Sequence, residues 1–156
     1  SDPDELHEVA VDPKTGGSYV ITQKWVHNYD IIRNTEDTIK SQWVGREITD
    51  SAELMKKSIT SHLSRVTGSA AFDAPRRFEI YRQSQPWGTL SHASGLFFIA
   101  YSASPEAYDY MMDRMTGLED DHSDDLMRMT SPVTGAFWYF PSADELERLT
   151  TSTGLL

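Results

Sequence analysis

The alternation of apolar and polar residues along the chain predicts four strands. Residues 18–26 and 78–83 alternate roughly between apolar or β-branched positions and polar ones, which is typical of half-buried strands. Residues 95–102 and 133–140 are almost continuously apolar or aromatic and are flanked by turn-forming residues. We therefore expect these four segments to form the sheet.

Two longer segments have the pattern of helices. Residues 35–44 carry acidic side chains near their start and are followed by Gly45. Residues 105–116 place Tyr108 and three methionines at the spacing i, i+3, i+4 and i+7, and Gly117 follows. The second helix is therefore expected to be amphipathic, with this stripe turned toward the sheet.

Two capping-box spacings predict shorter helices. Asp50 lies three residues before Glu53, which favours a helix near residues 51–57. Ser142 lies three residues before Glu145, which favours a last helix after the fourth strand.

The remaining segments are expected to be irregular. Residues 1–17 hold two prolines and two glycines and predict a lead-in that ends in a turn. Residues 67–77 have the composition of a loop, and residues 86–88 (Pro-Trp-Gly) are expected to break the second strand. The acidic residues 119–125 predict a solvated loop, and residues 150–156 a frayed tail.

The order of the predicted elements is βαββαβ, which is the α+β, ferredoxin-like arrangement. This arrangement has a mainly antiparallel sheet with its helices on one face. No repeat or linker divides residues 18–149, so we expect one domain there. The connection over residues 45–77 is long, and long insertions in compact domains are often functional.

Charge and composition narrow the class of protein. Among 156 residues, Asp and Glu number 24 against 14 Lys and Arg, a formal net charge of −10. Such a chain is repelled by nucleic acid and by anionic membranes, so neither is an expected partner. There is no cysteine, which excludes disulfides, thiolate nucleophiles and cysteine-ligated metals.

No targeting or membrane signal is visible in the sequence. No apolar run approaches the roughly 18 residues of a membrane span, and no basic start with an apolar stretch resembles a signal peptide. Because the chain opens with Ser1 rather than Met, we expect a recombinant, processed or partial form of a longer protein.

Two residues stand out as candidates for chemistry. In the second strand, alternation places Phe78, Ile80 and Arg82 on one face, followed by Ser84. A guanidinium turned into an apolar layer would need an anion or strong acceptors, whereas a strand-end arginine can also extend to water. His62 lies in the long insertion between apolar neighbours. It is either an ordinary packing residue or a metal or haem ligand.

Other familiar sites are not indicated. There is no Gly-x-Ser-x-Gly elbow, no Walker or dinucleotide-binding glycine motif, and no histidine pair with zinc spacing. The acid pairs Asp120-Asp121 and Asp124-Asp125 lack EF-hand spacing, so a solvated loop is favoured over a calcium site.

Taken together, six motifs resemble the C-terminal, haem-bearing half of the dye-decolourising (DyP-type) peroxidases. The resemblance runs from Glu8 to Leu149. In chain order the motifs are Gly16-Gly17-Ser18-Tyr19-Val20, Val44-Gly45-Arg46, Ser61-His62-Leu63-Ser64-Arg65-Val66, Tyr81-Arg82-Gln83-Ser84-Gln85-Pro86-Trp87-Gly88, Gly95-Leu96-Phe97-Phe98 and Pro132-Val133-Thr134-Gly135.

The resemblance implies a ferredoxin-like domain, one half of a dimeric α+β barrel, that holds haem b. It implies a peroxidase that uses hydrogen peroxide to oxidise dyes, phenols or porphyrin-like electron donors. The residues that match the family's haem site are His62 (proximal ligand), Asp124 or Asp125 (its carboxylate partner), Arg82 and Ser84 (distal side), Arg46 (near the propionates), and Leu96 and Phe98 (apolar wall).

One departure from the family is large. The Gly-x-x-Asp-Gly motif, whose aspartate lies on the distal side, is absent from this sequence together with the N-terminal half. We therefore expect a companion N-terminal half or a homo-oligomer, and the resemblance to bacterial members implies a cytoplasmic protein. Two alternatives stay open: a non-catalytic haem or porphyrin-binding module, and an association domain without a cofactor.

Overall fold

The structure is a computed structural model that describes residues 3–67, 78–89 and 93–152. The predicted loop over residues 67–77 therefore lies almost wholly outside the described residues, as does the end of the tail. In chain order the elements are α1 (Pro3–Ala10), β1 (Ser18–His27), α2 (Tyr29–Asn34), α3 (Asp37–Val44), α4 (His62–Thr67), β2 (Tyr81–Arg82), β3 (Gln85–Gly88), β4 (Ser94–Ser102), α5 (Glu106–Thr116), the 3₁₀ helix η2 (Asp125–Arg128), β5 (Thr130–Phe140) and α6 (Ala143–Ser152).

The sheet has the strand order of a ferredoxin-like fold. Its main path is β2–β4–β1–β5, β3 pairs with β4, and every pairing is antiparallel. A register shift between Lys24 and Trp25 marks a bulge in the pairing of β1 with β5. The predicted α+β class and the predicted βαββαβ order are confirmed, because the four strand segments and the two longer helices occur in that order.

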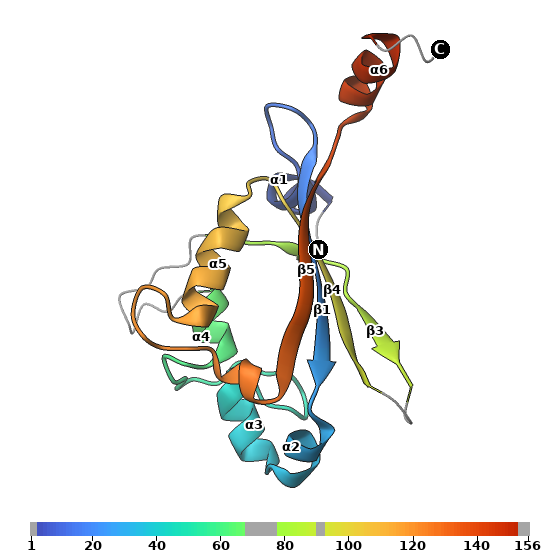
Figure 1. Ribbon diagram of the computed structural model, residues 1–156. Coiled ribbons are helices and arrows are strands. Elements are labelled where there is room, and N and C mark those ends of the chain that lie inside the picture. Colours follow the sequence, from blue (N-terminus) through green and yellow to red (C-terminus); the bar gives the residue numbers. More distant parts are fainter. Residues whose placement is uncertain (1–2, 68–77, 90–92, 153–156) are drawn as a thin grey trace.

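Helices α4 and α5 lie on one side of the sheet (Figure 1). The core beneath α5 is built from Ile21, Ala100 and Tyr108, which are at most 4% exposed. The Tyr108 hydroxyl lies 2.9 Å from the Tyr19 carbonyl oxygen and 2.8 Å from that of Ala100. Burial raises the pKa of Tyr108 well above its ordinary value. The helix is thus held to the two central strands by a hydrogen bond as well as by apolar contact.

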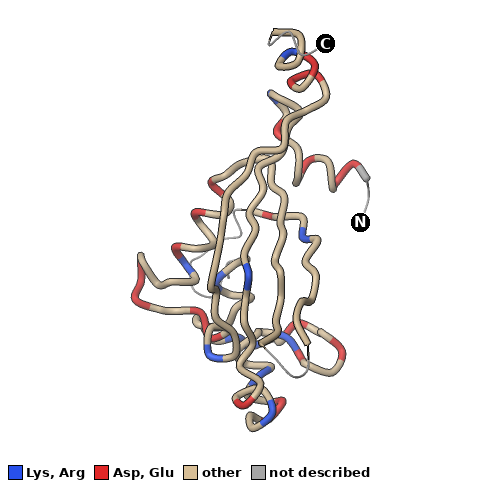
Figure 2. The backbone as a smooth tube through the Cα atoms, turned by 45° about the vertical axis from the view of Figure 1, so that its right-hand side comes forward, with Lys and Arg blue, Asp and Glu red and all other residues tan. Residues whose placement is uncertain are grey.

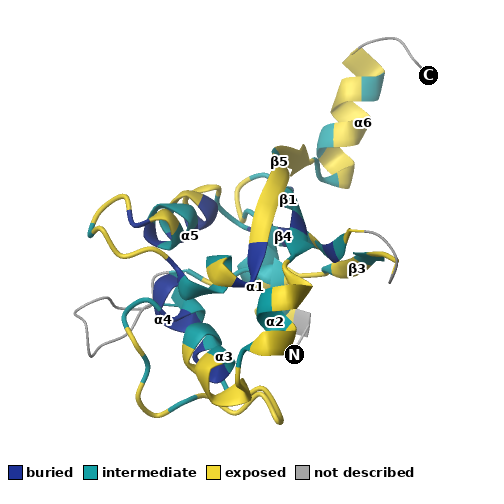
Figure 3. Ribbon diagram, turned by 60° about the horizontal axis from the view of Figure 1, so that its bottom comes forward, coloured by how far each residue is buried: buried dark blue, intermediate teal, exposed yellow. Residues whose placement is uncertain are grey.

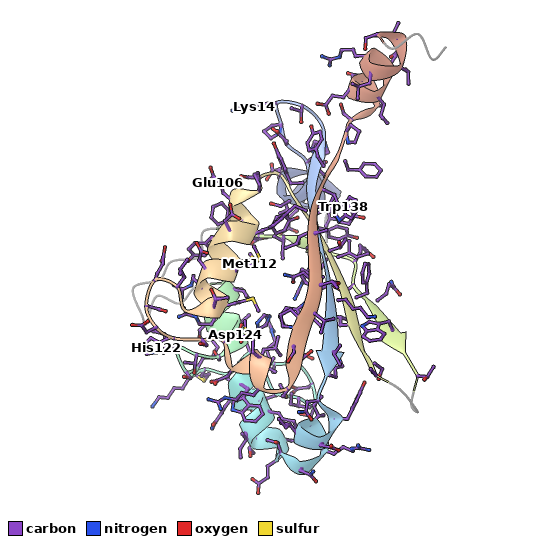
Figure 4. The ribbon with its side chains drawn as sticks, viewed as in Figure 1. Lys14, Glu106, Met112, His122, Asp124 and Trp138 are labelled. Carbon is purple, nitrogen blue, oxygen red and sulfur yellow. The ribbon has the colours of Figure 1, made fainter. Side chains whose placement is uncertain are left out.

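The opposite face of the sheet is largely uncovered. Phe97, Trp138 and Phe140 belong to this face and are 38%, 59% and 66% exposed. Trp138 lies on the side of β5 away from α5 (Figure 4), and most of β5 is exposed (Figure 3). Charged residues gather on the helices and loops rather than on the strands (Figure 2). This outer face is therefore open and largely apolar, with Lys24 lying over the Trp87 ring.

Three segments differ from the expected secondary structure. The lead-in is not irregular throughout, because residues 3–10 form α1, whose Val9 carbonyl accepts from the Ala103 amide. Residues 29–34 form the unexpected helix α2, with Asn28 as its N-cap. The predicted helix at 51–57 is wrong: this segment carries an isolated β-bridge between Arg46 and Glu53.

The second predicted strand is shorter and is not broken where expected. Regular pairing covers only Tyr81–Arg82, and Pro86, Trp87 and Gly88 belong to β3 instead of ending the strand. Proline is tolerated in β3 because the strand lies at the sheet edge, where a missing amide costs no ladder bond. Trp87 Nε1 donates to the Trp25 carbonyl at 3.0 Å.

The C-terminal helix α6 extends beyond the end of the sheet (Figure 1). The predicted capping box is present: the Glu145 amide donates to Ser142 Oγ at 3.3 Å, and the Ser142 amide donates to Glu145 Oε2 at 3.0 Å. The helix runs to Ser152, so the expected fraying at Thr150 does not occur there. No helix among the described residues is long and apolar enough to cross a bilayer.

Candidate functional site

The first residue of α4 carries an imidazole bonded to a buried carboxylate. His62 Nδ1 lies 2.7 Å from Asp124 Oδ2; the Asp124 side chain is fully buried, and that of His62 is 23% exposed. An ionised carboxylate only accepts, so the hydrogen of this bond belongs to Nδ1, and Nε2 is the ring nitrogen left for a ligand. A histidine oriented by a carboxylate in this way is a common arrangement among metal ligands.

Asp124 is fixed by its own backbone and by both carboxylate oxygens. Its amide donates to the Met115 carbonyl near the end of α5 at 2.9 Å. Its Oδ1 accepts from the Leu126 amide at 2.8 Å, which caps η2, while Oδ2 is bonded to His62. Figure 4 shows Asp124 beside α4, in the loop that follows α5.

Asp125 has different partners. One of its carboxylate oxygens accepts from the Thr60 hydroxyl, and the other accepts from Arg128 Nε at 2.7 Å. Its amide donates to the Thr60 carbonyl at 2.8 Å. Of the two adjacent acids, Asp124 is therefore the one that lies against His62, and Asp125 holds the segment before α4.

A second ion pair holds the same loop to α4. Arg65 is completely buried, and its two terminal nitrogens lie 2.8 and 2.7 Å from the carboxylate oxygens of Asp120. The Arg65 hydrogen bonds lower the pKa of Asp120 to about 2. The prediction that residues 119–125 form a solvated loop is therefore wrong for Asp124, whose side chain is buried against α4, whereas Asp120 stays 32% exposed while bound to Arg65.

The face of the sheet beneath the helices presents an apolar wall. In the β1–β4 register, Leu96 is opposite Trp25 and Phe98 is opposite Gln23. Paired residues in antiparallel strands point to the same face, so both lie on the side of the Ala100 core. Leu96 and Phe98 are only half-buried, and Met112 points from α5 toward the sheet (Figure 4). The wall is thus apolar but incompletely covered by this chain.

The structure places Arg82 and Ser84 at the edge of this wall. Arg82 is paired with Ala100, so it lies on the helix-side face, where Ile80 packs against the core, as the predicted alternation of Ile80 and Arg82 requires. Its side chain is exposed rather than buried. Ser84 is half-buried, and its Oγ accepts from the Ile99 amide at 3.4 Å. A cation and a hydroxyl therefore flank the wall at its open margin.

Arg46 is held within its own loop. Its Nη1 donates to the Ser51 carbonyl at 3.0 Å, and its Nη2 lies 3.9 Å from Glu53 Oε2. The side chain is 43% exposed. The structure therefore brings His62 and Asp124 together and sets Arg82, Leu96 and Phe98 on one sheet face. It places Ser84 between β2 and β3 and keeps Arg46 on the connection that leads to α4.

Comparison with known proteins identifies the family to which the chain belongs. The family model described as "Dyp-type peroxidase, C-terminal" matches residues 5–145. The chain belongs to the DyP-type peroxidase family. Among curated relatives, the dye-decolorizing peroxidase of Rhodococcus erythropolis is 26% identical over 134 residues, covering 85% of this chain and 39% of that protein. The dye-decolorizing peroxidase of Mycolicibacterium paratuberculosis is 28% identical over 141 residues, covering 87% of this chain and 39% of that protein.

Solved DyP-type structures share the fold. A dye-decolorizing protein from V. cholerae matches with a TM-score of 0.83 and 34% identity, over 91% of this chain and 48% of that one. A DypB variant from Rhodococcus jostii RHA1, solved in complex with haem, matches with a TM-score of 0.82 and 27% identity, over 96% of this chain and 50% of that one. The chain thus spans about two fifths of the curated DyP relatives and about half of the solved chains.

Sequence reasoning missed part of this DyP-type domain's buried polar network. Arg65 and Arg114 are both buried, and each donates from Nε to the other's carbonyl, at 2.7 and 2.9 Å. A signal was available, because Arg65 lies between the apolar residues Leu63 and Val66 of α4 and the loop after α5 is strongly acidic. Periodicity alone does not say that residues 65 and 120 are partners.

Proposed function

We propose that this chain is the haem-bearing part of a peroxidase that reduces hydrogen peroxide, with His62 as the axial ligand of haem b. The observation that carries the proposal is the 2.7 Å contact between His62 Nδ1 and the buried Asp124 carboxylate. A histidine arranged in this way has a defined tautomer and a more basic free nitrogen, which suits a ligand of ferric iron.

The other residues fit a planar, largely apolar group that carries carboxylates. Leu96 and Phe98 form a half-covered apolar wall on the sheet face beneath the helices. Arg46 is a half-exposed cation on the connection to α4, suited to pairing with a propionate. His62, Leu96, Phe98 and Arg46 are therefore the residues that would hold haem b.

When bound, haem supplies a redox-active iron at which peroxide can be reduced. The chain's own residues have distinct tasks around that chemistry. Asp124 accepts the hydrogen bond from His62 Nδ1, which keeps the proton on that nitrogen and increases the electron density of the ring. Arg82 offers a cation that stabilises negative charge as the O–O bond of peroxide breaks, and Ser84 adds a hydroxyl on the same side.

The rest of the catalytic unit is expected outside this chain. No Gly-x-x-Asp-Gly motif occurs in the sequence, and the outer sheet face exposes Phe97, Trp138 and Phe140. Apolar surface of this kind is commonly an association site. We propose that a companion N-terminal half, or else a second copy in a homo-oligomer, covers that face, and that dyes, phenols or porphyrin-like donors supply the electrons. The resemblance to bacterial members favours a cytoplasmic location.

A non-catalytic haem-binding module is the second candidate, favoured by the exposed position of Arg82 beside a wall that this chain only half covers. Peroxide-dependent oxidation of a dye by the haem-loaded chain, with and without a companion half, separates the two. Dye oxidation supports the peroxidase. Stable haem binding without oxidation in either case supports the module.

The ligand assignment is tested by titrating haem into the parent, His62→Ala and His122→Ala while following the Soret band. His122 is the matched control because it is an exposed histidine in the loop after α5, at the outer edge in Figure 4. We expect His62→Ala to lose stable haem retention and His122→Ala to keep it. Parental binding by His62→Ala would show that another group ligates the iron.

A further inference from the structure

The helix that carries His62 also carries a buried cation one turn later. Arg65 has no exposed surface, and all three of its guanidinium nitrogens are engaged. Two of them form a bidentate pair with Asp120, and Nε donates to the Arg114 carbonyl at 2.7 Å. A bidentate pair of this kind fixes direction as well as distance.

Asp120 belongs to the same short loop as Asp124. That loop leaves α5 at Gly117, whose φ of 75° is in the left-handed region, and returns where the Asp124 amide donates to the Met115 carbonyl. The carboxylates of Asp120 and Asp124 both face α4, four residues apart, and contact Arg65 and His62, which are three residues apart. The loop therefore contacts the helix through two side-chain pairs, Asp120 with Arg65 and Asp124 with His62.

Arg114 fixes α4 along its axis. Its Nε donates to the Arg65 carbonyl at 2.9 Å, and its Nη2 lies 3.3 Å from the Ser64 carbonyl. These are carbonyls near the end of a helix, where no intrahelical partner is available. With the reverse bond from Arg65 to the Arg114 carbonyl, neither helix can slide or rotate past the other without losing charged hydrogen bonds.

Stability alone is a weak reason for a fully buried guanidinium. Burying an ion pair costs desolvation, and replacing such pairs by apolar side chains is often neutral or stabilising. What an apolar replacement cannot provide is a directed link between α4 and one particular carboxylate of the loop. This link joins the same helix and the same loop as the hydrogen bond between His62 and Asp124.

We propose that the Arg65–Asp120 ion pair is a positioning element: it sets the distance and direction of the hydrogen bond between His62 Nδ1 and Asp124, and so the orientation of the imidazole. The importance of that orientation for a cofactor rests on the proposed function, whereas the ion pair and the hydrogen bond that it sets both lie within this chain. Neither Arg65 nor Asp120 contacts the imidazole, so both act through the helix and the loop.

The direct test is ¹⁵N NMR of the His62 ring in the 156-residue chain without haem. We compare the parent with Asp120→Asn, which removes the charge, and Asp120→Glu, which keeps it. Asp37→Asn is the matched control, because Asp37 forms a salt bridge with Lys40 at 2.7 Å on α3 and its side chain is 66% exposed.

The expected result is a protonated Nδ1 with a hydrogen-bonded N–H signal in the parent and in Asp37→Asn. In Asp120→Asn that signal should weaken or disappear and the ring should populate both tautomers, with partial recovery in Asp120→Glu. In a Soret titration, the haem dissociation constant of Asp120→Asn should rise about 3- to 10-fold, at or below the low end of the 10- to 100-fold range for a direct partner of a ligand.

An unchanged His62 N–H signal in folded Asp120→Asn would overturn the proposal, even if the variant is less stable, because the ion pair would then be structural only. If Asp120→Asn does not fold, Arg65→Lys keeps the cation, loses the bidentate geometry and must show the same loss of signal. Failure of His62→Ala to impair haem binding would instead contradict the proposed function and leave the ring measurement unaffected.

Discussion

The two sides of the candidate site are built very differently. On the helix side, His62, Asp124, Arg65 and Asp120 are joined by hydrogen bonds of 2.7–2.8 Å, and three of the four are largely or wholly buried. On the sheet side, Arg82 is exposed and the wall around it is half-covered. The contrast shows that the polar contacts of the helix side are complete within this chain, whereas the residues proposed for the peroxide side are open to solvent.

A substitution on the sheet side should have the largest effect, and that effect should be on the rate of reaction with peroxide. Replacing Arg82 by Ala removes the charged group proposed to stabilise charge during O–O cleavage, which is worth about 10²–10³ in rate. We expect haem affinity in Arg82→Ala to stay within about twofold of the parent, since Arg82 is not a ligand. Stopped-flow mixing of each haem-loaded protein with peroxide measures the effect. A parental rate would show that Arg82 is structural.

The helix side should give the next largest effect. Asp124→Asn keeps the size of the side chain but replaces the carboxylate that accepts from His62 Nδ1. Loss of such a partner of a metal ligand costs about 10- to 100-fold in affinity. A Soret titration measures the dissociation constant, and Asp125→Asn is the matched control because its partners are Thr60 and Arg128. Equal losses in both variants would contradict the distinction between the two acids.

Low pH should reduce the contribution of the Arg65–Asp120 ion pair to the free energy of unfolding. The pKa of Asp120 is lowered to about 2 by Arg65, so its contribution to the free energy of unfolding is fully present above pH 5. That contribution falls as pH drops through 4 toward 2. Because about a third of the Asp120 side chain is exposed, solvent screening reduces the contribution to about 1 kcal/mol. Urea unfolding at pH 7, 4 and 2.5 should show Asp120→Asn less stable than the parent by this amount at pH 7, with the difference shrinking steadily toward the lowest pH. A gap that is constant with pH would exclude the ion pair as its cause.

Substitutions on the outer face should change the free energy of unfolding least and the association of the chain most. Trp138→Ser and Phe140→Ser remove exposed apolar side chains, so each should change the free energy of unfolding by about 0.5 kcal/mol or less. Sedimentation should show that the parent self-associates or binds a companion half and that the variants do so less. A monodisperse parent of 17.7 kDa that binds haem with high affinity would contradict the proposal that a partner covers the outer face.

The parts of the fold that the sequence predicts are those that depend on local patterns, and the parts that it misses depend on tertiary position. Strand segments were predictable because an apolar period of two residues is a local property, and the capping box at Ser142 was predictable for the same reason. Helix α2 was missed because its six residues carry no periodic stripe. Strand β3 was missed because Pro86 normally interrupts pairing, and only its place at the sheet edge makes it acceptable.

The candidate site shows the same limit. Motif resemblance was enough to select His62, Arg82 and the adjacent acids. The sequence did not decide between Asp124 and Asp125, because the choice depends on which carboxylate the turn after α5 directs toward α4. The Arg65–Asp120 pair joins residues 55 positions apart, which no local pattern records.

The reciprocal bonds between Arg65 and Arg114 also constrain how the domain folds. Helix α4 has only six residues, too few to persist as an isolated helix in water. It can form only when α5 is already in place to exchange hydrogen bonds with it. The two helices should therefore open and close as one cooperative unit. In native-state hydrogen exchange, the amides of α4 should be protected nearly as strongly as those of α5, and His62 meets Asp124 only as that unit closes.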